Sequence, residues 1–236
     1  MSYIILALNY EAMQYDIQKI GGKVCRIYCG EHPKTLLIQP IVEREYSRWE
    51  EEVVLLTENN KALLIVAFEV SDWEKELMPW ADRAVSKREG VGEHAHDTLT
   101  YIEQELLITL QSRFGVLPCI LGGYSLGGLF ALWASMQTNA FMGIAAASPS
   151  VWIEGWLEYV QKHRTLAQQV YMSLGNKEEF AKNKSIAQVG ENLRACHKIL
   201  LSQLGDERTI LEWNEGNHFH NVSARTARGF IWNLTL

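Results

Sequence analysis

Short apolar runs alternate along the chain with segments in which apolar residues recur every three or four positions. Six runs of six or seven residues are rich in branched and small apolar side chains. They are too short for buried helices and are therefore predicted to be buried strands. They cover residues 34–39, 62–68, 118–124, 142–147, 169–174 and 208–213. Stretches at 3–8 and 24–29 are predicted to add edge strands, and Pro40 is expected to close the first of the six.

Helical periodicity fills the intervals between these runs. Apolar residues recur at helical spacing across 99–114, 126–136 and 186–204, and a last helix is predicted at 230–234. Strands that alternate with amphipathic helices predict an α/β fold, with a mostly parallel central sheet covered by helices on both faces. Such a sheet binds ligands at the carboxyl ends of its strands, so we expect the chemistry at that edge.

Length and composition predict a single globular domain over residues 1–236. The chain has 236 residues, near the upper limit of about 250 for one hydrophobic core. Within it, 1–33 is expected to supply edge strands and 71–97 a lid or loop region. Hydrophobic residues make up 47% and charged residues 21%, which excludes a disordered, collagen-like or coiled-coil chain. Nothing in the sequence indicates an oligomeric state.

The net charge and the cysteines indicate which kinds of binding partner and which cellular compartment to expect. The net charge of −6 argues against nucleic-acid binding, and the acidic run Glu50–Glu52 is interpreted as a solvated helix face. The four cysteines form no CxxC pair and are interpreted as packed free thiols. No segment approaches the ~20 apolar residues that span a bilayer, and no convincing signal peptide opens the chain. We therefore expect a cytoplasmic protein without membrane contact.

A candidate nucleophile follows the third of the six predicted strands. Gly123-Tyr124-Ser125-Leu126-Gly127 matches the pattern G-x-S-x-G, in which a serine occupies a sharp turn from a strand to a helix. Glycines two before and two after the serine remove side chains that would clash across the turn. The helix N-terminus beside Ser125 offers free N–H groups to a developing oxyanion. A glycine-rich turn with an idle serine is the alternative.

A serine hydroxyl needs an imidazole to accept its proton, and that histidine is expected late in the chain. His163 lies in a polar segment and His197 in the middle of a predicted helix. His218 directly follows a Gly-Asn turn after the last predicted strand, where a loop can carry the imidazole over the serine. His218 is therefore the preferred general base, with His220 as the alternative.

The acid that orients the imidazole is expected after the fifth predicted strand. Glu178, three residues past Gly175, is the first choice and Glu179 the second. Asp206 precedes the sixth strand, which is the wrong end of the sheet for this role.

The oxyanion hole needs two N–H donors. The N–H of Leu126, next after the nucleophile, is one expected donor. Because Pro40 has no N–H, Ile41 is the expected second donor, from the loop after the first predicted strand. Trp73, Trp152 and Tyr124 are candidate walls of a substrate pocket, although the tryptophans are equally suited to covering the core.

Six segments of the sequence together resemble the putative esterase family of the α/β-hydrolase superfamily, which includes enterochelin esterase-like and S-formylglutathione hydrolase-like proteins. The segments are Asp-Trp at 72–73, Leu-Met-Pro-Trp at 77–80, Gly-Gly-Tyr-Ser-Leu-Gly-Gly-Leu at 122–129, Ala-Ser-Pro-Ser-Val-Trp at 147–152, Ser-Leu-Gly-Asn-Lys-Glu-Glu at 173–179 and Gly-Asn-His-Phe at 216–219. The resemblance spans about 34–234. It implies an α/β-hydrolase fold and a serine hydrolase with Ser125 as nucleophile and His218 as base.

One position departs from the family pattern. Relatives often carry Asp after the Ser-Leu-Gly segment, where this chain has Asn176. An amide cannot supply the charge, so either Glu178 is the acid or a Ser125–His218 dyad operates.

The resulting hypothesis is a serine hydrolase that cleaves a small-molecule carboxylic ester through an acyl-enzyme on Ser125. The mechanism needs no cofactor. His94 and His96 lack an obvious third ligand, so no metal site is expected. An acyltransferase or a thioesterase using the same site is an alternative within enzymes. A non-catalytic binding module that retains the fold is the alternative outside them.

Overall fold

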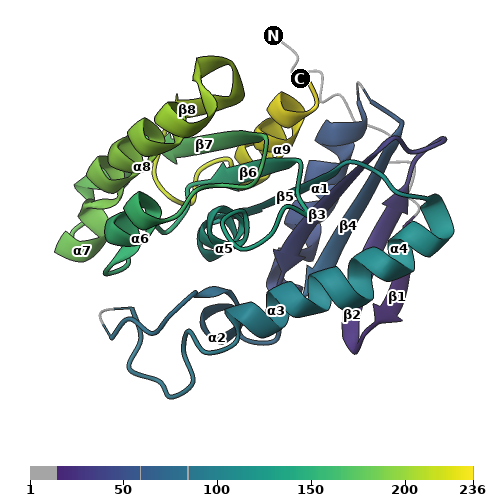
Figure 1. The fold of residues 1–236 in the computed structure, drawn as a ribbon, viewed down its shortest axis with the longest axis horizontal. Helices are drawn as coiled ribbons and strands as arrows, with labels where there is room; N and C mark the ends of the chain where they lie inside the picture. The colour runs from purple at the N-terminus through teal and green to yellow at the C-terminus, as the bar shows by residue number, and fades with distance from the viewer. Residues whose placement is uncertain (1–14, 59, 84, 236) are drawn as a thin grey trace, which may run out of the picture.

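The computed structural model describes residues 15–58, 60–83 and 85–235, and this part of the chain forms one eight-stranded sheet (Figure 1). The strand order is β1-β2-β4-β3-β5-β6-β7-β8. β4, β3, β5, β6, β7 and β8 run parallel, while β2 is antiparallel to both β1 and β4. The bounds are β1 (Asp16–Ile20), β2 (Lys23–Cys29), β3 (Thr35–Ile41), β4 (Leu63–Glu69), β5 (Cys119–Tyr124), β6 (Gly143–Ala147), β7 (Gln169–Gly175) and β8 (Thr209–Asn214).

The strands predicted from apolar runs agree with β2 to β8 to within about two residues at each end. The strand predicted at 3–8 lies outside the described residues. β1 was not predicted from the sequence. It contains only two apolar residues, Ile17 and Ile20, and it lies at the edge of the sheet, where Ile17 remains 58% exposed.

The expectation that Pro40 closes its strand is wrong, because β3 continues through Pro40 to Ile41. The N–H of Val70 donates to the Ile41 carbonyl at 2.9 Å, so the polar groups of Ile41 face β4. Successive residues of a strand point their backbone groups to opposite sides, so Pro40 faces β5. Pairing between β3 and β5 has already ended at Ile38, and the missing N–H therefore costs no ladder hydrogen bond.

Helices cover both faces of the sheet, which confirms the predicted α/β-hydrolase-like layering. The helices are α1 (Tyr46–Thr57), α2 (Trp73–Leu77), α3 (Ala95–Tyr101), α4 (Leu107–Phe114), α5 (Leu126–Ala134), α6 (Trp156–Lys162), α7 (Lys184–Ala187), α8 (Val189–Leu204) and α9 (Val222–Asn233). A π-helical segment, η2 (Ile102–Leu106), joins α3 to α4 within the helix predicted at 99–114. No helix in the described residues is long and apolar enough to cross a membrane.

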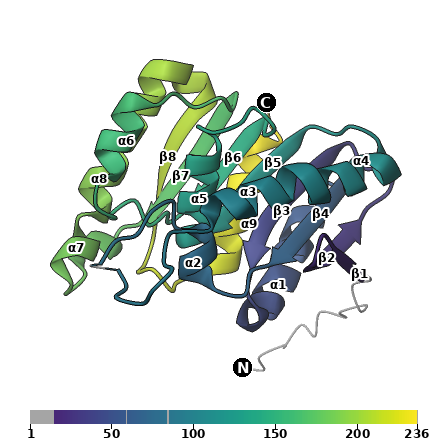
Figure 2. The same ribbon diagram turned by 60° about the horizontal axis from the view of Figure 1, so that its bottom comes forward.

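Alternating strand residues divide the core into two layers. Leu36 and Ile38 belong to the larger layer, beneath α4, α5 and α8, whereas Leu37 and Ile41 belong to the smaller one, beneath α1 and α9. This division follows from the two-residue period of a strand, which sends successive side chains to opposite faces. Figures 1 and 2 show α1 and α9 together on one face and α3, α4, α5 and α8 on the other.

The interpretation of Glu50–Glu52 as a solvated helix face is wrong for Glu52. Glu52 is only 5% exposed in α1, and its carboxylate accepts a hydrogen bond from Gln39 Nε2 of β3. Glu51, in contrast, is exposed. α1 packs on the sheet through Trp49 and Val53, and the helical period brings Glu52 to that same face.

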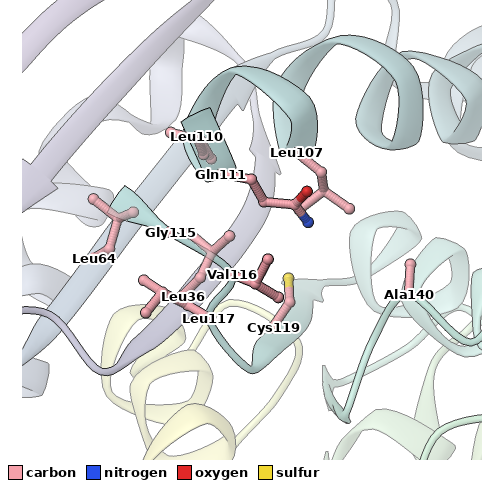
Figure 3. A pocket seen from close by; sticks show the side chains of 10 residues that line it. All are labelled: Leu36, Leu64, Leu107, Leu110, Gln111, Gly115, Val116, Leu117, Cys119 and Ala140. Atoms are coloured by element: carbon pink, nitrogen blue, oxygen red, sulfur yellow. The ribbon is translucent and has the colours of Figure 1, made fainter. Parts of the chain in front are cut away.

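The amino and carboxyl ends of the parallel strands differ in chemistry. At the amino ends of β3, β4 and β5, a small apolar pocket of about 130 Å³ opens beneath α4 (Figure 3). Leu36, Leu64 and Cys119 line it from the strands, and Leu107 and Leu110 line it from the helix. The opposite edge carries the polar residues described next.

Candidate active site

Four neighbouring parallel strands end at the same edge, and a hydroxyl, carboxyl or imidazole side chain follows each of them. Ser125 comes directly after β5, Ser148 directly after β6, Glu178 three residues after β7, and His218 four residues after β8. The carboxyl ends of parallel strands are the usual place for a site in such a sheet. The topology thus brings residues from 125 to 218 into one place.

Ser125 occupies a strained turn between β5 and α5. Its backbone has φ 58° and ψ −119°, a region that side-chain-bearing residues rarely adopt and that is often found at functional sites. The turn is tight enough that a Cβ on Gly123 would lie 2.8 Å from the carbonyl carbon of Gly127. Glycine at 123 is therefore a requirement of the turn that carries Ser125.

A continuous series of hydrogen bonds joins Ser125, His218 and Glu178. The Oγ of Ser125 lies 3.0 Å from Nε2 of His218, and Nδ1 of His218 lies 2.7 Å from Oε2 of Glu178. An ionised carboxylate can only accept, so Nδ1 carries the proton and donates to Glu178. Nε2 is then left to accept the hydroxyl proton of Ser125.

Glu178 is 5% exposed, and the hydrogen bonds to its carboxylate favour the charged form. Oε1 accepts hydrogen bonds from the Ser148 hydroxyl at 2.7 Å, the Gly175 N–H at 2.7 Å and Arg225 Nη2 at 2.8 Å. Burial raises the pKa of this carboxyl, but the hydrogen bond and charge of His218, followed by Arg225 and Ser148, lower it to about 2. Glu178 is therefore an anion at neutral pH.

The alternatives considered from the sequence lie elsewhere. Glu179 turns away and pairs with Arg194 of α8 at 2.6 Å. His220 is exposed. Asn176 links two loops: its Oδ1 accepts from the Gly216 N–H at 3.1 Å, and its own N–H donates to the Asn214 carbonyl at 2.8 Å. Asn176 thus supports the turn that precedes His218.

Ser150 is a close neighbour of Ser125 that the sequence reasoning did not single out. Its Oγ lies 3.2 Å from the Oγ of Ser125, and its N–H donates to the Ser125 carbonyl at 3.1 Å. The single hydroxyl proton of Ser125 is directed at His218, so Ser150 is the donor in the contact between the two hydroxyls. The signal for it was a Ser-Pro-Ser segment placed directly after a buried strand.

The two expected oxyanion donors differ in their surroundings. Leu126 is the first residue of α5, where N–H groups have no acceptor within the helix, and it lines the cleft beside the site. Ile41 is the last residue of β3 and is 3% exposed, and the cleft is lined by the next residue, Val42. The assignment of Ile41 as second donor stays a prediction.

A cleft of about 620 Å³ adjoins Leu126 and is mainly polar. Trp73 lines it, together with a charged wall in which Arg88 pairs with Asp72 at 2.7 Å and with Glu74 at 3.2 Å. Of the described residues, the lining consists of Val42, Glu43, Arg44, Glu69, Val70, Ser71, Asp72, Trp73, Glu74, Arg88 and Leu126. The wall belongs largely to the 71–97 segment.

The other two candidate pocket residues do not line this cleft. Trp152 is half-buried against the larger core layer. Tyr124 stands beside His218, with 5.1 Å between the ring centroids, and its hydroxyl donates to the His218 carbonyl at 2.8 Å. Tyr124 therefore contacts the loop that carries the imidazole.

Comparison with solved structures shows the same fold in esterases and hydrolases of low sequence identity. An IroE-like serine hydrolase from Shewanella oneidensis matches with a TM-score of 0.73 and 17% identity, over 94% of this chain and 80% of that one. Siderophore hydrolase EstB from Aspergillus nidulans matches with a TM-score of 0.70 and 16% identity, over 92% of both chains. The enterobactin esterase FES from Shigella flexneri matches with a TM-score of 0.67 and 16% identity, over 94% of this chain and 60% of that one.

A family model gives the more direct relationship. No curated protein matches the sequence, but the model described as Putative esterase matches residues 53–227, which include Ser125, Glu178 and His218. Because this match covers most of the sequence, the chain belongs to the Putative esterase family.

Proposed function

We propose that the protein is a serine hydrolase that cleaves carboxylic esters, with Ser125 as nucleophile, His218 as general base and Glu178 as the acid that orients the imidazole. The observation that carries the proposal is the hydrogen-bonded series from Ser125 Oγ through both ring nitrogens of His218 to Glu178 Oε2. Membership of an esterase family supports the same class of reaction.

Acylation follows from this geometry. The Oγ of Ser125 forms a bond to the ester carbonyl carbon while its proton passes to Nε2 of His218. The imidazolium that results is stabilised by the buried anion of Glu178. The oxyanion that forms on the carbonyl oxygen accepts a hydrogen bond from the N–H of Leu126 at the start of α5. His218 then gives the proton to the departing alkoxide, which leaves as the alcohol.

Deacylation repeats these reaction steps with water as the nucleophile. Water adds to the acyl carbon and loses a proton to His218, and the carboxylic acid leaves as Ser125 Oγ regains that proton. Ser150 donates to the same Oγ and supports the departing oxygen in this second step.

The polar cleft favours a small-molecule ester with polar or charged groups next to the scissile bond. Both signs of charge line it, from Glu43 and Glu69 to Arg44 and Arg88, whereas a long acyl chain requires an apolar wall. The names of the similar structures, which include siderophore hydrolases and an enterobactin esterase, support a polar ester as substrate here.

Intact-mass measurement after treatment with a fluorophosphonate probe tests the proposal. We expect a single adduct on the wild type, mapped to the peptide 122–129, and none on Ser125→Ala. That variant should also lose at least ~10³-fold in the rate of p-nitrophenyl ester hydrolysis.

Ser135→Ala is the matched control, because Ser135 is a buried serine at the other end of α5. It should keep both the adduct and the activity. An unlabelled wild type that is folded, or full activity in Ser125→Ala, would contradict the proposal.

A further inference from the structure

Arg225 is an almost completely buried cation directly beneath the candidate site. It lies in the first turn of α9, seven residues after His218, and is 2% exposed. A buried guanidinium is costly unless its charge and its N–H groups are matched. Its partners therefore show what the fold uses it for.

One side of the guanidinium holds the acid. Nη2 donates to Oε1 of Glu178 at 2.8 Å and also to the hydroxyl of Ser148. The Ser148 hydroxyl in turn donates to the same Oε1 at 2.7 Å. Together with the N–H of Gly175, Arg225 and Ser148 give Oε1 three hydrogen-bond donors. The other oxygen, Oε2, is left to accept from His218.

The other side of the guanidinium holds the histidine loop. Nη1 donates to the Tyr124 hydroxyl at 2.6 Å and to the Asn217 carbonyl at 3.3 Å. The Tyr124 hydroxyl in turn donates a hydrogen bond to the His218 carbonyl at 2.8 Å. Burial raises the pKa of Tyr124 to about 12, so the phenol remains a donor throughout the range of an enzyme assay.

We propose that Arg225 is a positioning residue of this site, which holds the Glu178 carboxylate with one nitrogen and, through Tyr124, the backbone of His218 with the other. The inference rests on the proposed function. It explains why the acid and the base, which come from loops after different strands, keep one relative geometry. We call this set of contacts, from Arg225 to Glu178 and through Tyr124 to His218, the brace. Because Tyr124 directly precedes Ser125, the brace contacts or adjoins Ser125, His218 and Glu178.

The brace makes two predictions that a purely structural arginine would not. Loss of the guanidinium should lower kcat by roughly 10- to 100-fold with little change in KM, because misalignment of the reacting groups slows chemistry more than binding. It should also move the acidic limb of the kcat/KM profile to higher pH. Without the nearby cation, the Glu178–His218 pair binds a proton more readily.

The experiment compares four variants in steady-state hydrolysis of a p-nitrophenyl ester from pH 5 to 9. Arg225→Met should show both effects. Arg225→Lys should return the acidic limb towards its wild-type position, because the charge is restored, but only part of kcat. Tyr124→Phe should lower kcat about fivefold, because one neutral hydrogen bond is lost. Arg228→Met is the control, since Arg228 is an exposed arginine on the same helix that pairs with Glu212 at 3.0 Å.

Wild-type kcat and an unmoved acidic limb in Arg225→Met would overturn the inference. If Arg225→Met does not fold, as judged by circular dichroism, Tyr124→Phe decides: a kcat within twofold of the wild type would reject the brace. These outcomes are separate from failure of the proposed function, which would show first as a wild type that neither labels nor hydrolyses.

Discussion

At the scale of single residues, Glu178 and Glu179 show how one position in the chain changes the chemistry of a carboxylate. Glu178 is buried and hydrogen-bonded to His218, whereas Glu179 is directed to the surface and pairs with Arg194. The short 3-10 turn Glu178–Phe180 separates the two side chains. Position along the sequence alone does not separate them.

Substitution of the two glutamates tests this difference. Glu178→Gln should lower kcat by up to ~10⁴-fold, because an uncharged amide neither stabilises the imidazolium nor enforces the required tautomer. Glu179→Gln should stay within a few-fold of wild type, since a surface ion pair contributes little. Steady-state kinetics on one ester measure both. Rates close to the wild type in both variants would favour a Ser125–His218 dyad.

At the scale of elements, the packing of α1 on the sheet buries the carboxyl group of Glu52, whose hydrogen bond comes from the neutral amide of Gln39. Burial raises the pKa of Glu52 to about 8, although the hydrogen bond from Gln39 lowers it. The unfolded chain loses this proton near the ordinary value of 4.5. Between these two values the folded state binds more protons than the unfolded state, so stability falls as pH rises.

Glu52→Gln removes that dependence, because glutamine resembles the protonated acid and can still accept from Gln39. The variant should match the wild type near pH 4.5 and become more stable by at most about 5 kcal/mol at pH 8. Urea unfolding at several pH values measures the difference. Glu51→Gln, exposed and next in the chain, is the control and should show no such trend. A wild type whose lead over Glu52→Gln grows with pH would show that the assignment of a neutral Glu52 is wrong.

At the scale of the whole molecule, the Glu178 carboxylate links segments that are far apart in sequence. Its partners come from the loop after β6, from the end of β7, from the loop after β8 and from α9. Because the pKa of Glu178 is about 2 in the folded protein and ordinarily 4.5, its charge contributes stability above pH 4.5. That contribution is lost progressively as the pH falls from 4.5 towards 2.

Acid unfolding measures this contribution. The difference in pKa corresponds to about 3 kcal/mol of unfolding free energy. We expect the stability of the wild type relative to Glu178→Gln to decline by about that amount between pH 5 and pH 2. Urea titrations of both proteins at each pH give the comparison. A constant difference across this range would mean that the carboxylate gains nothing from its partners in the fold.

Local sequence was sufficient for most of the architecture and for the turn that carries Ser125. Strand and helix periods extend over a few residues, and they predicted the parallel strands, the helices over 99–114, 126–136 and 186–204, and the strand–turn–helix around Ser125. They did not predict α1, α2, α6 or the first two turns of α9. The glycine spacing about Ser125 is likewise a local steric requirement. His218 follows from similar reasoning, because a loop after the last strand must lie at the same edge as Ser125.

The burial of the charged side chains and their hydrogen-bond partners depended on segments that meet only when the chain folds. Glu52 is neutral because α1 packs on β3, Glu178 is an anion because four segments converge on it, and Arg225 is braced against residues 47 to 101 positions away. A local pattern describes which face a side chain can occupy. The dielectric and the hydrogen-bond partners on that face come from other parts of the chain, and they set the charge on which the chemistry depends.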